Sequence, residues 1–237
     1  MKWLKESLQI LRWVGLPAFL ALAASNIADQ LLNTRLEALL LSDTGGGSEL
    51  WVLAGLSLFN GLFFPLFVTA CCLFGLLRHR GLQEDAPLFF GRTFQQLSIE
   101  TLRSWGSALR WGLLLVVPGA IRLLQLIFVP FIVCTSKAYE NGTQDALEAS
   151  RRYFKKRSFK ISILVFVFQM VLPLILTEVL DPWRTFEKTP LAALLCTVAD
   201  LMVFVFFTQA LYRIFESVRQ EFNDEPVFQL ERSQNPR

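Results

Sequence analysis

Long apolar blocks separated by short polar segments dominate the pattern of this 237-residue chain. A helix of about 20 predominantly apolar residues is long enough to cross the hydrocarbon core of a membrane. Four such blocks predict membrane spans at about residues 11–31, 50–77, 161–180 and 191–212. The pattern therefore predicts an all-α fold, a polytopic helical membrane bundle.

Two further segments mix apolar and polar positions in the way that helices at a membrane surface do. In residues 1–12, Leu4, Leu8 and Leu11 recur at helical spacing on one face. The polar residues around the rest of the helix are Lys2, Lys5, Glu6, Gln9 and Arg12. Residues 93–110 show the same separation of an apolar and a polar face. Both segments predict interfacial amphipathic helices.

A fifth apolar block, residues 105–135, contains Pro118 and Gly119 near its middle. If this block crossed once, the basic segments on its two sides would face opposite compartments. If it turns at Pro118-Gly119 and returns, 19 of the 23 Lys and Arg residues lie on one side and 3 on the other. Cytoplasmic loops carry an excess of Lys and Arg, so we predict a hairpin, with both termini in the cytoplasm.

The arms of this predicted hairpin, about 105–117 and 120–135, are short. Each measures roughly 20–24 Å as a helix, against a hydrocarbon core of about 30 Å. A re-entrant hairpin is therefore expected, and two full spans, making six in all, remain the alternative. Residues 1–215 are predicted to form a single integral domain of the inner (plasma) membrane, and 216–237 a polar cytoplasmic tail.

Composition narrows the chemistry further. Hydrophobic residues make up 53% of the chain and charged residues only 18%, and the net charge of +3 does not favour nucleic-acid binding. The four cysteines lack the C-x-x-C spacing of zinc or redox sites, and His79 is the single histidine. No catalytic, metal or cofactor site is predicted, and we do not expect an enzyme.

Polar residues inside the predicted spans are the first functional candidates, because charges at membrane depth are costly unless paired. Arg122 lies near the predicted hairpin turn, and Asp200 lies midway along the last span. We predict a buried ion pair between them, which would lock the hairpin against that span. In the alternative, Asp200 is neutral and hydrogen-bonded, and Arg122 reaches outer headgroups. Asn26, Asp29 and Gln30 cluster toward the outer end of the first span.

A strongly basic helix over residues 143–160 is the second candidate. Near an anionic inner leaflet each Lys or Arg contributes on the order of 1 kcal/mol to membrane binding. The alternative is that these charges only fix the topology. The candidate contacts to anionic lipid are Arg151, Arg152, Lys155, Lys156, Arg157 and Lys160.

Residues about 110–170 also carry a family resemblance, through Pro118-Gly119, Arg122, Phe128, Pro130, Gly142, Ala146-Leu147 and Ser150. They resemble a bacterial multi-pass membrane protein family that is related to the membrane domain fused to some glycerophosphoryl diester phosphodiesterases. The resemblance implies a helical inner-membrane protein and supplies no catalytic residues. Where the family pattern ends near a glycine, this chain has Lys155-Lys156-Arg157.

Two functions follow from these observations. The first is a non-catalytic protein that scaffolds or stabilises a membrane assembly, with a protein partner or a second copy of itself. The alternative is a transport or lipid-handling protein that uses the hairpin, Arg122 and Asp200. The expected partners are the bilayer and anionic phospholipid at its cytoplasmic face, with no nucleic acid.

Overall fold

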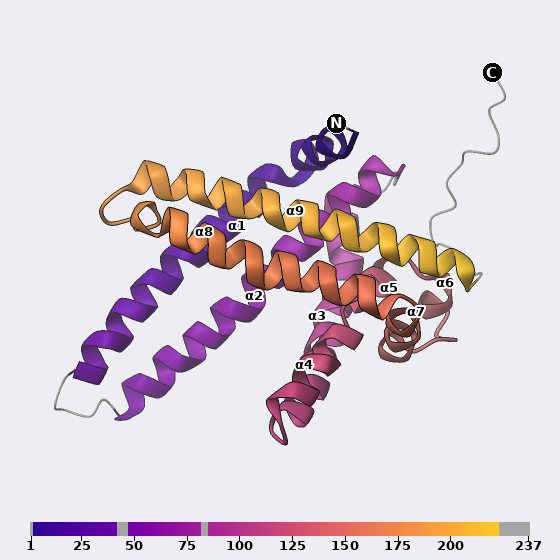
Figure 1. Ribbon diagram of the computed structural model, residues 1–237, viewed down its shortest axis with the longest axis horizontal. Helices are drawn as coiled ribbons and strands as arrows, with labels where there is room; N and C mark the ends of the chain where they lie inside the picture. The colour runs from indigo at the N-terminus through magenta and orange to yellow at the C-terminus, as the bar shows by residue number, and fades with distance from the viewer. Residues whose placement is uncertain (1, 42–46, 82–84, 223–237) are drawn as a thin grey trace.

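The computed structural model describes residues 2–41, 47–81 and 85–222. Of these residues 89% are helical and none is in a strand, which confirms the all-α prediction. Five helical segments are long and apolar enough to cross a membrane, which is consistent with a membrane protein (Figure 1). They are Glu6–Leu41, Gly47–His79, Val116–Thr135, Ala146–Leu180 and Pro190–Glu221.

The first pair of helices, α1 (Lys2–Leu41) and α2 (Gly47–His79), lies side by side as an antiparallel hairpin (Figure 1). A glycine permits their close approach, because a Cβ atom at Gly75 would lie 2.8 Å from the Cγ2 atom of Val14. The surface helix and first span expected at the N-terminus are one continuous helix. That helix runs to Leu41, so most of the polar loop expected before the second span is helical.

The second pair is the hairpin predicted from the charge pattern. Its outgoing arm is α3 (Ala86–Gly112), and its returning arm consists of α4 (Val116–Gln125) and α5 (Val129–Thr135). The chain reverses at residues 113–115, so the prediction that Pro118-Gly119 forms the turn is wrong. Pro118 instead lies in the first turn of α4, where a missing backbone N–H removes no bond within the helix.

Gly119 fixes the distance between the two arms. It is buried, and a Cβ atom at this position would lie 2.7 Å from the Cα atom of Gly112 and 2.9 Å from its nitrogen. These backbone atoms of α3 cannot move aside as a flexible side chain can. The arms therefore touch through two glycines, one on each helix.

The returning arm breaks between α4 and α5 because of Pro130, which has no N–H to donate within the helix. Ser150 supplies the missing partners from α7 (Ala146–Phe166). Its hydroxyl donates to the carbonyl oxygen of Gln125 at 2.8 Å and accepts from the backbone N–H of Phe128 at 3.2 Å. One buried side chain thus satisfies the break and attaches α7 to the hairpin.

After the short helix α6 (Lys137–Glu140), the predicted basic helix and fourth span form one helical segment. It comprises α7, a π-helical turn η1 (Val167–Val171) and α8 (Leu172–Leu180). A kink marks the boundary between its basic and apolar parts at Arg157, where φ is −132° and ψ is 27°. Through η2 (Asp181–Trp183) the chain reaches α9 (Pro190–Glu221). The tail predicted from residue 216 is therefore helical at first, and its remainder lies outside the described residues.

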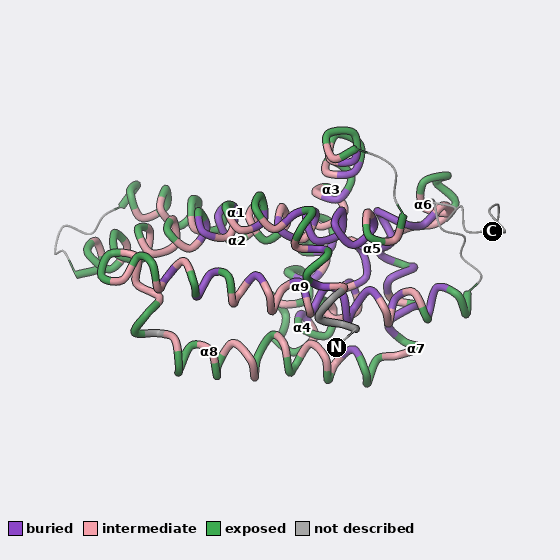
Figure 2. The backbone as a smooth tube through the Cα atoms, turned by 90° about the horizontal axis from the view of Figure 1, so that it is seen from above, coloured by how far each residue is buried: buried purple, intermediate pink, exposed green. Residues whose placement is uncertain are grey.

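The hairpins meet in one apolar core at the end of the bundle where α9 finishes (Figure 2). Aromatic rings form its centre: the ring centroid of Phe215 on α9 lies 5.6 Å from Phe131, 5.8 Å from Phe128 and 5.8 Å from Tyr153. These rings come from α5, the α4–α5 junction and α7. Burial of such large side chains at one point fixes the relative positions of the hairpins.

Polar contacts attach α1 to α9 beside this core. Gln209 accepts from the hydroxyl of Ser7 at 2.6 Å and donates to the carboxylate of Glu6 at 2.7 Å. Arg213, one turn further along α9, also donates to Glu6. Away from the core the helices separate, and α8 has no buried residue at all.

The glycine contact gives the first prediction. Gly119→Ala should lower the free energy of unfolding by about 1–3 kcal/mol, because the new methyl group meets the backbone of α3. Gly106→Ala is the matched control on α3, where a Cβ atom has nothing within 4 Å. That control should be neutral or stabilising by up to about 1 kcal/mol. Thermal unfolding in detergent measures both, and equal effects of the two substitutions would contradict the assigned packing.

Candidate functional site

Asp200 lies in a polar site between α1 and α9, and its partner is Arg184 from the loop before α9. The Nη2 atom of Arg184 donates to Oδ1 of Asp200 at 2.8 Å, and the two side chains are only 31% and 26% exposed. The predicted ion pair between Arg122 and Asp200 is therefore wrong. The loop before α9 folds back over that helix and brings a closer cation, whereas Arg122 belongs to α4 in another hairpin.

Gln30 on α1 holds this loop in place through both ends of its side-chain amide. The amide nitrogen donates to the backbone oxygen of Arg184 at 2.8 Å, and the amide oxygen accepts from the backbone N–H of Phe186 at 3.1 Å. Asn26, one turn earlier, donates to the hydroxyl of Thr197 on α9 at 3.2 Å. The amides of α1 therefore position the arginine that meets Asp200.

Asp29 completes the polar face of α1 and contacts α2. The side-chain nitrogen of Asn60 donates to Oδ1 of Asp29 at 2.5 Å and to the backbone oxygen of Ser25 at 3.1 Å. Asn60 is only 3% exposed. This contact attaches the two helices of the first hairpin, and a charged side chain of α1 is thereby hydrogen-bonded inside the bundle.

A cavity of about 160 Å³ lies among these residues, bounded by α1, α9 and the loop. Ligand pockets usually measure about 300–1,000 Å³, so this one is small for a metabolite. Its hydrogen bonds join three segments of the chain, and we interpret it chiefly as a polar lock between helices. Sequence reasoning found Asn26, Asp29, Gln30 and Asp200, but it did not single out Asn60 or Arg184.

Arg122 lies on the opposite side of the molecule's core, at the base of the α3–α4 hairpin. Its Nε atom donates to the hydroxyl of Ser107 on α3 at 3.3 Å, and its Nη1 atom donates to Oε1 of Gln125 at 3.2 Å. Both acceptors are neutral. Arg122 therefore joins the two arms of the hairpin, and it keeps its full positive charge uncompensated by these contacts.

The basic residues of α7 fall into three groups. Arg157 donates to Glu221 at 2.5 Å, and the ammonium of Lys156 lies 5.7 Å from the ring centroid of Phe222, so these two contact the end of α9. Arg151 faces inward, and its Nε atom is buried without a hydrogen-bond partner among the described residues. The side chains of Arg152, Lys155 and Lys160 are exposed.

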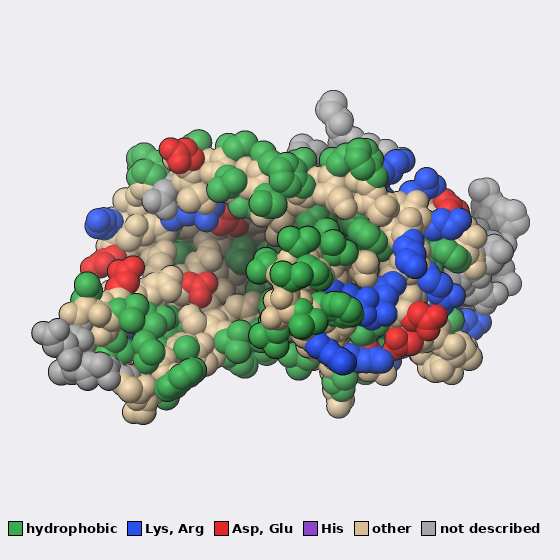
Figure 3. All heavy atoms as spheres, turned by 60° about the horizontal axis from the view of Figure 1, so that its bottom comes forward, with side chains coloured by type: hydrophobic (Ala, Val, Ile, Leu, Met, Phe, Trp, Pro, Cys, Tyr) green, Lys and Arg blue, Asp and Glu red, His purple; other side chains and the backbone are tan. Residues whose placement is uncertain are grey.

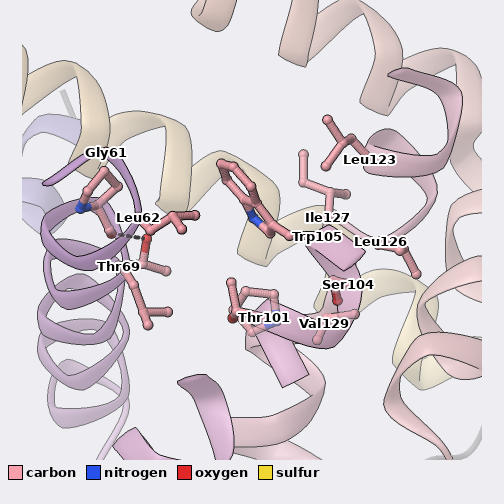
Figure 4. Close-up of a pocket in the computed structure, with 13 residues that line it drawn as sticks. Gly61, Leu62, Thr69, Thr101, Ser104, Trp105, Leu123, Leu126, Ile127 and Val129 are labelled. Carbon is pink, nitrogen blue, oxygen red and sulfur yellow. Dashed lines mark hydrogen bonds between the residues drawn. The ribbon is translucent and has the colours of Figure 1, made fainter. Parts of the chain in front are cut away.

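A second cavity, of about 240 Å³, separates α2 from the hairpin (Figure 4). Its lining is almost entirely apolar, and Trp105 on α3 projects between α2 and the returning arm (Figure 4). Two of the hydroxyls in the wall donate to backbone oxygens of their own helices. Thr69 donates to the Pro65 oxygen at 2.7 Å, and Ser104 donates to the Glu100 oxygen at 2.8 Å. The space suits an apolar chain rather than a polar molecule.

Arg103 lies on α3, one turn before Ser107, and unlike Arg122 it has carboxylate partners. It donates to Asp145 at 2.6 Å and to Glu100 at 3.4 Å, and the hydroxyl of Tyr139 donates to Glu100 at 3.4 Å. Burial, followed by the negative charge of Glu100, raises the pKa of Tyr139 to about 12. The network attaches α6 and the start of α7 to α3.

The described residues contain no group of three His, Cys, Asp or Glu side chains that could hold a metal ion. All four cysteines are free and buried. The chain matches no protein-family model, no curated protein and no solved structure. The resemblance noted in the sequence therefore stays a prediction.

The polar lock gives the second prediction. Arg184→Gln should lower the free energy of unfolding by about 1–3 kcal/mol, because it leaves the mostly buried Asp200 carboxylate without its cation. Combining it with Asp200→Asn should cost less than the sum of the two single changes. Thermal unfolding of all four proteins in detergent measures the coupling. The more exposed pair Arg157–Glu221 serves as the control, with a coupling below about 1 kcal/mol, and strict additivity at Arg184–Asp200 would contradict the assignment.

A pH prediction follows from Tyr139. Its phenol should titrate near pH 12, above the ordinary value of 10.0, in a difference absorbance titration of the wild type minus Tyr139→Phe. Since the folded state binds this proton more tightly, the stabilisation is full below pH 10 and is lost as the pH rises toward 12. A difference titration centred at pH 10 would show that the phenol is not held in this network.

Proposed function

We propose that this protein is a non-catalytic scaffold of the inner membrane, which stabilises a membrane assembly through its helix surfaces. The observation that carries the proposal is the outward face of the η1–α8 segment. In the most apolar stretch of Ala146–Leu180 no residue is buried inside the chain, and α8 lies along the edge of the molecule (Figure 2). None of the described residues buries this surface, so we assign it to contacts outside the chain.

Gln169 distinguishes this surface from one that meets lipid alone. It lies in the π-helical turn, is exposed, and is surrounded in sequence by Phe166, Val167, Phe168 and Met170. Polar side chains in apolar helices are costly in lipid and stabilise contacts between helices by hydrogen bonding. A glutamine amide both donates and accepts, so it is complementary to the same amide in a second copy of the chain. We therefore assign the second copy as the partner on this face.

The placement in the membrane is part of the proposal. Most Lys and Arg residues belong to segments at the end where the core lies, and the bacterial inner membrane with both termini in the cytoplasm fits the positive-inside rule. In this orientation the hairpin enters from the cytoplasmic side, with its tip in the hydrocarbon.

Lipid handling is the second candidate, and the hairpin favours it. Residues 113–117 at its tip are five consecutive large apolar residues, each between 68% and 88% exposed. The apolar cavity beside Trp105 adjoins the same hairpin (Figure 4). An acyl chain lying between α2 and the hairpin would fill that space.

Cysteine cross-linking tests the scaffold. Because Cys71, Cys72, Cys134 and Cys196 are buried, an introduced surface thiol is the reactive one. Gln169→Cys should give a disulfide-linked dimer in native membranes under mild oxidation. Gln169→Leu should weaken the dimer, measured by native mass spectrometry, by roughly threefold to thirtyfold, since an interhelical hydrogen bond contributes about 0.6–2 kcal/mol.

The control is Leu58→Cys, at a position on α2 that is 63% exposed. It has a similar apolar setting but lies on another hairpin, so it should cross-link far less. Equal cross-linking at the two positions would indicate random collision. A monomer in native membranes with no linkage at Gln169→Cys would contradict the proposed assembly.

A further inference from the structure

Two arginines, Arg122 on α4 and Arg151 on α7, lie where α7 packs against the hairpin. Helices α4 and α7 pack against each other, and Arg151 follows Ser150, whose hydroxyl binds the same Gln125 that holds the Arg122 side chain. No carboxylate in the described part of the chain forms an ion pair with either. By contrast, five other arginines have carboxylate partners: Arg80 with Glu216, Arg103 with Asp145, Arg157 with Glu221, Arg184 with Asp200, and Arg213 with Glu6.

The chain holds these two like charges together by other contacts. Arg122 is fixed by Ser107 and Gln125 at 3.3 and 3.2 Å. Ser150, the neighbour of Arg151, is completely buried and donates to the backbone oxygen of the same Gln125 at 2.8 Å. The fold therefore brings Arg151 to Arg122, although the repulsion between them opposes it. An anion between the two guanidinium groups would offset that repulsion.

We propose that Arg122 and Arg151 bind a phosphate group, namely the headgroup phosphate of an anionic phospholipid. Guanidinium groups bind phosphate through parallel N–H···O bonds, and two of them complement the charge and the several oxygens of one phosphate. Ser107 and Gln125 are positioning residues that set the direction of the Arg122 side chain. The buried Nε of Arg151, which has no partner within the described chain, gains an acceptor.

The surroundings identify an amphiphile rather than a free anion. Ile121 and Leu123 beside Arg122 are 47% and 48% exposed. The apolar tip of the hairpin, residues 113–117, begins about 7–8 Å from Arg122 toward the start of α4, at 1.5 Å per residue. Figure 3 shows Lys and Arg side chains directly next to hydrophobic ones on the face where the hairpin comes forward. A phosphate at the arginines therefore has apolar surface within reach of attached acyl chains.

This site is separate from the face of α8 that the scaffold proposal uses, so either proposal can fail alone. A dimer that survives Arg122→Gln, for example, would leave the scaffold intact while the phosphate site is lost.

Native mass spectrometry of the full-length protein in mild detergent, with phosphatidylglycerol added as the probe, tests the site. Arg122→Gln and Arg151→Gln should each weaken the binding of the first lipid by about tenfold or more, as expected for a lost charge-assisted hydrogen bond. Arg152→Gln is the matched control, because it removes the same charge from the neighbouring, exposed position. It should change the affinity less than about twofold, since an exposed charge is screened.

Two further measurements separate the possible outcomes. Arg122→Lys keeps the charge but not the planar fork, so a folded Arg122→Lys protein with weakened lipid binding supports the site even if Arg122→Gln does not fold. Inorganic phosphate is the second probe: if it raises the thermal unfolding midpoint as much as phosphatidylglycerol does, and only with both arginines present, the occupant is free phosphate and the lipid assignment is overturned. Equal losses of lipid affinity in Arg151→Gln and Arg152→Gln would overturn the phosphate site itself. Unchanged lipid affinity in both Arg122→Gln and Arg122→Lys would overturn it as well.

Discussion

The contact of Ser150 with the break between α4 and α5 is the interaction on which the rest of the arrangement depends. Pro130 cannot donate a backbone hydrogen bond, so the returning arm of the hairpin must break. In a bilayer the freed backbone groups must find partners within the protein. The Ser150 hydroxyl satisfies the Gln125 oxygen and the Phe128 N–H together, at 2.8 and 3.2 Å. The start of α7 is thereby attached to the hairpin.

Two other features follow from that attachment. Phe128 at the break and Tyr153 on α7 both pack against Phe215 on α9, with ring centroids 5.8 Å away in each case. The pair formed by the α7–α8 segment and α9 therefore packs on the same core. Arg151, next to Ser150 in the chain, is brought to Arg122. Core packing and the gathering of positive charge therefore have one local cause. The residues that carry the family resemblance include Phe128, Pro130 and Ser150, and this contact gives them a physical role in this chain.

Much of the fold could be predicted from the sequence, because hydropathy and charge act along the chain. The spans at 50–77 and 191–212 fall within α2 and α9, and the charge distribution predicted that the block at 105–135 returns. The turn was misplaced at Pro118 because proline is as well tolerated in the first turn of a helix as in a turn. The predicted spans at 11–31 and 191–212 lie inside longer helices, because a helix can continue beyond its apolar block.

The candidate site was harder to predict than the fold. The position of Asp200 midway along the predicted last span indicates that this carboxylate needs a partner. It does not identify the neighbouring segment that supplies the partner. Arg184 lies 16 positions away in the loop before α9, and the folding of that loop onto Gln30 brings it to Asp200. The pairing of Arg122 with Ser107 depends similarly on the register between two arms, which two glycines set. A single sequence gives little indication of which residues on neighbouring helices contact one another.

The distribution of satisfied and unsatisfied polar groups connects structure with the proposed role. Inside the bundle, Asp29 and Gln209 have partners from other helices, and Gln30 and Asp200 have partners from the loop before α9. Among the described residues, Gln169 on the outer segment is exposed, and Arg122 and Arg151 have no carboxylate partner. Single buried atoms without a partner also occur inside the bundle, at Oδ1 of Asn60, Oγ1 of Thr101 and Nε of Arg184. In an apolar environment an unpaired polar group costs more than in water, so such groups persist where something outside the chain pairs with them. One surface offers a neutral amide suited to a helix, and the other offers paired cations suited to a phosphate. A protein that joins a second copy while holding a lipid headgroup needs both.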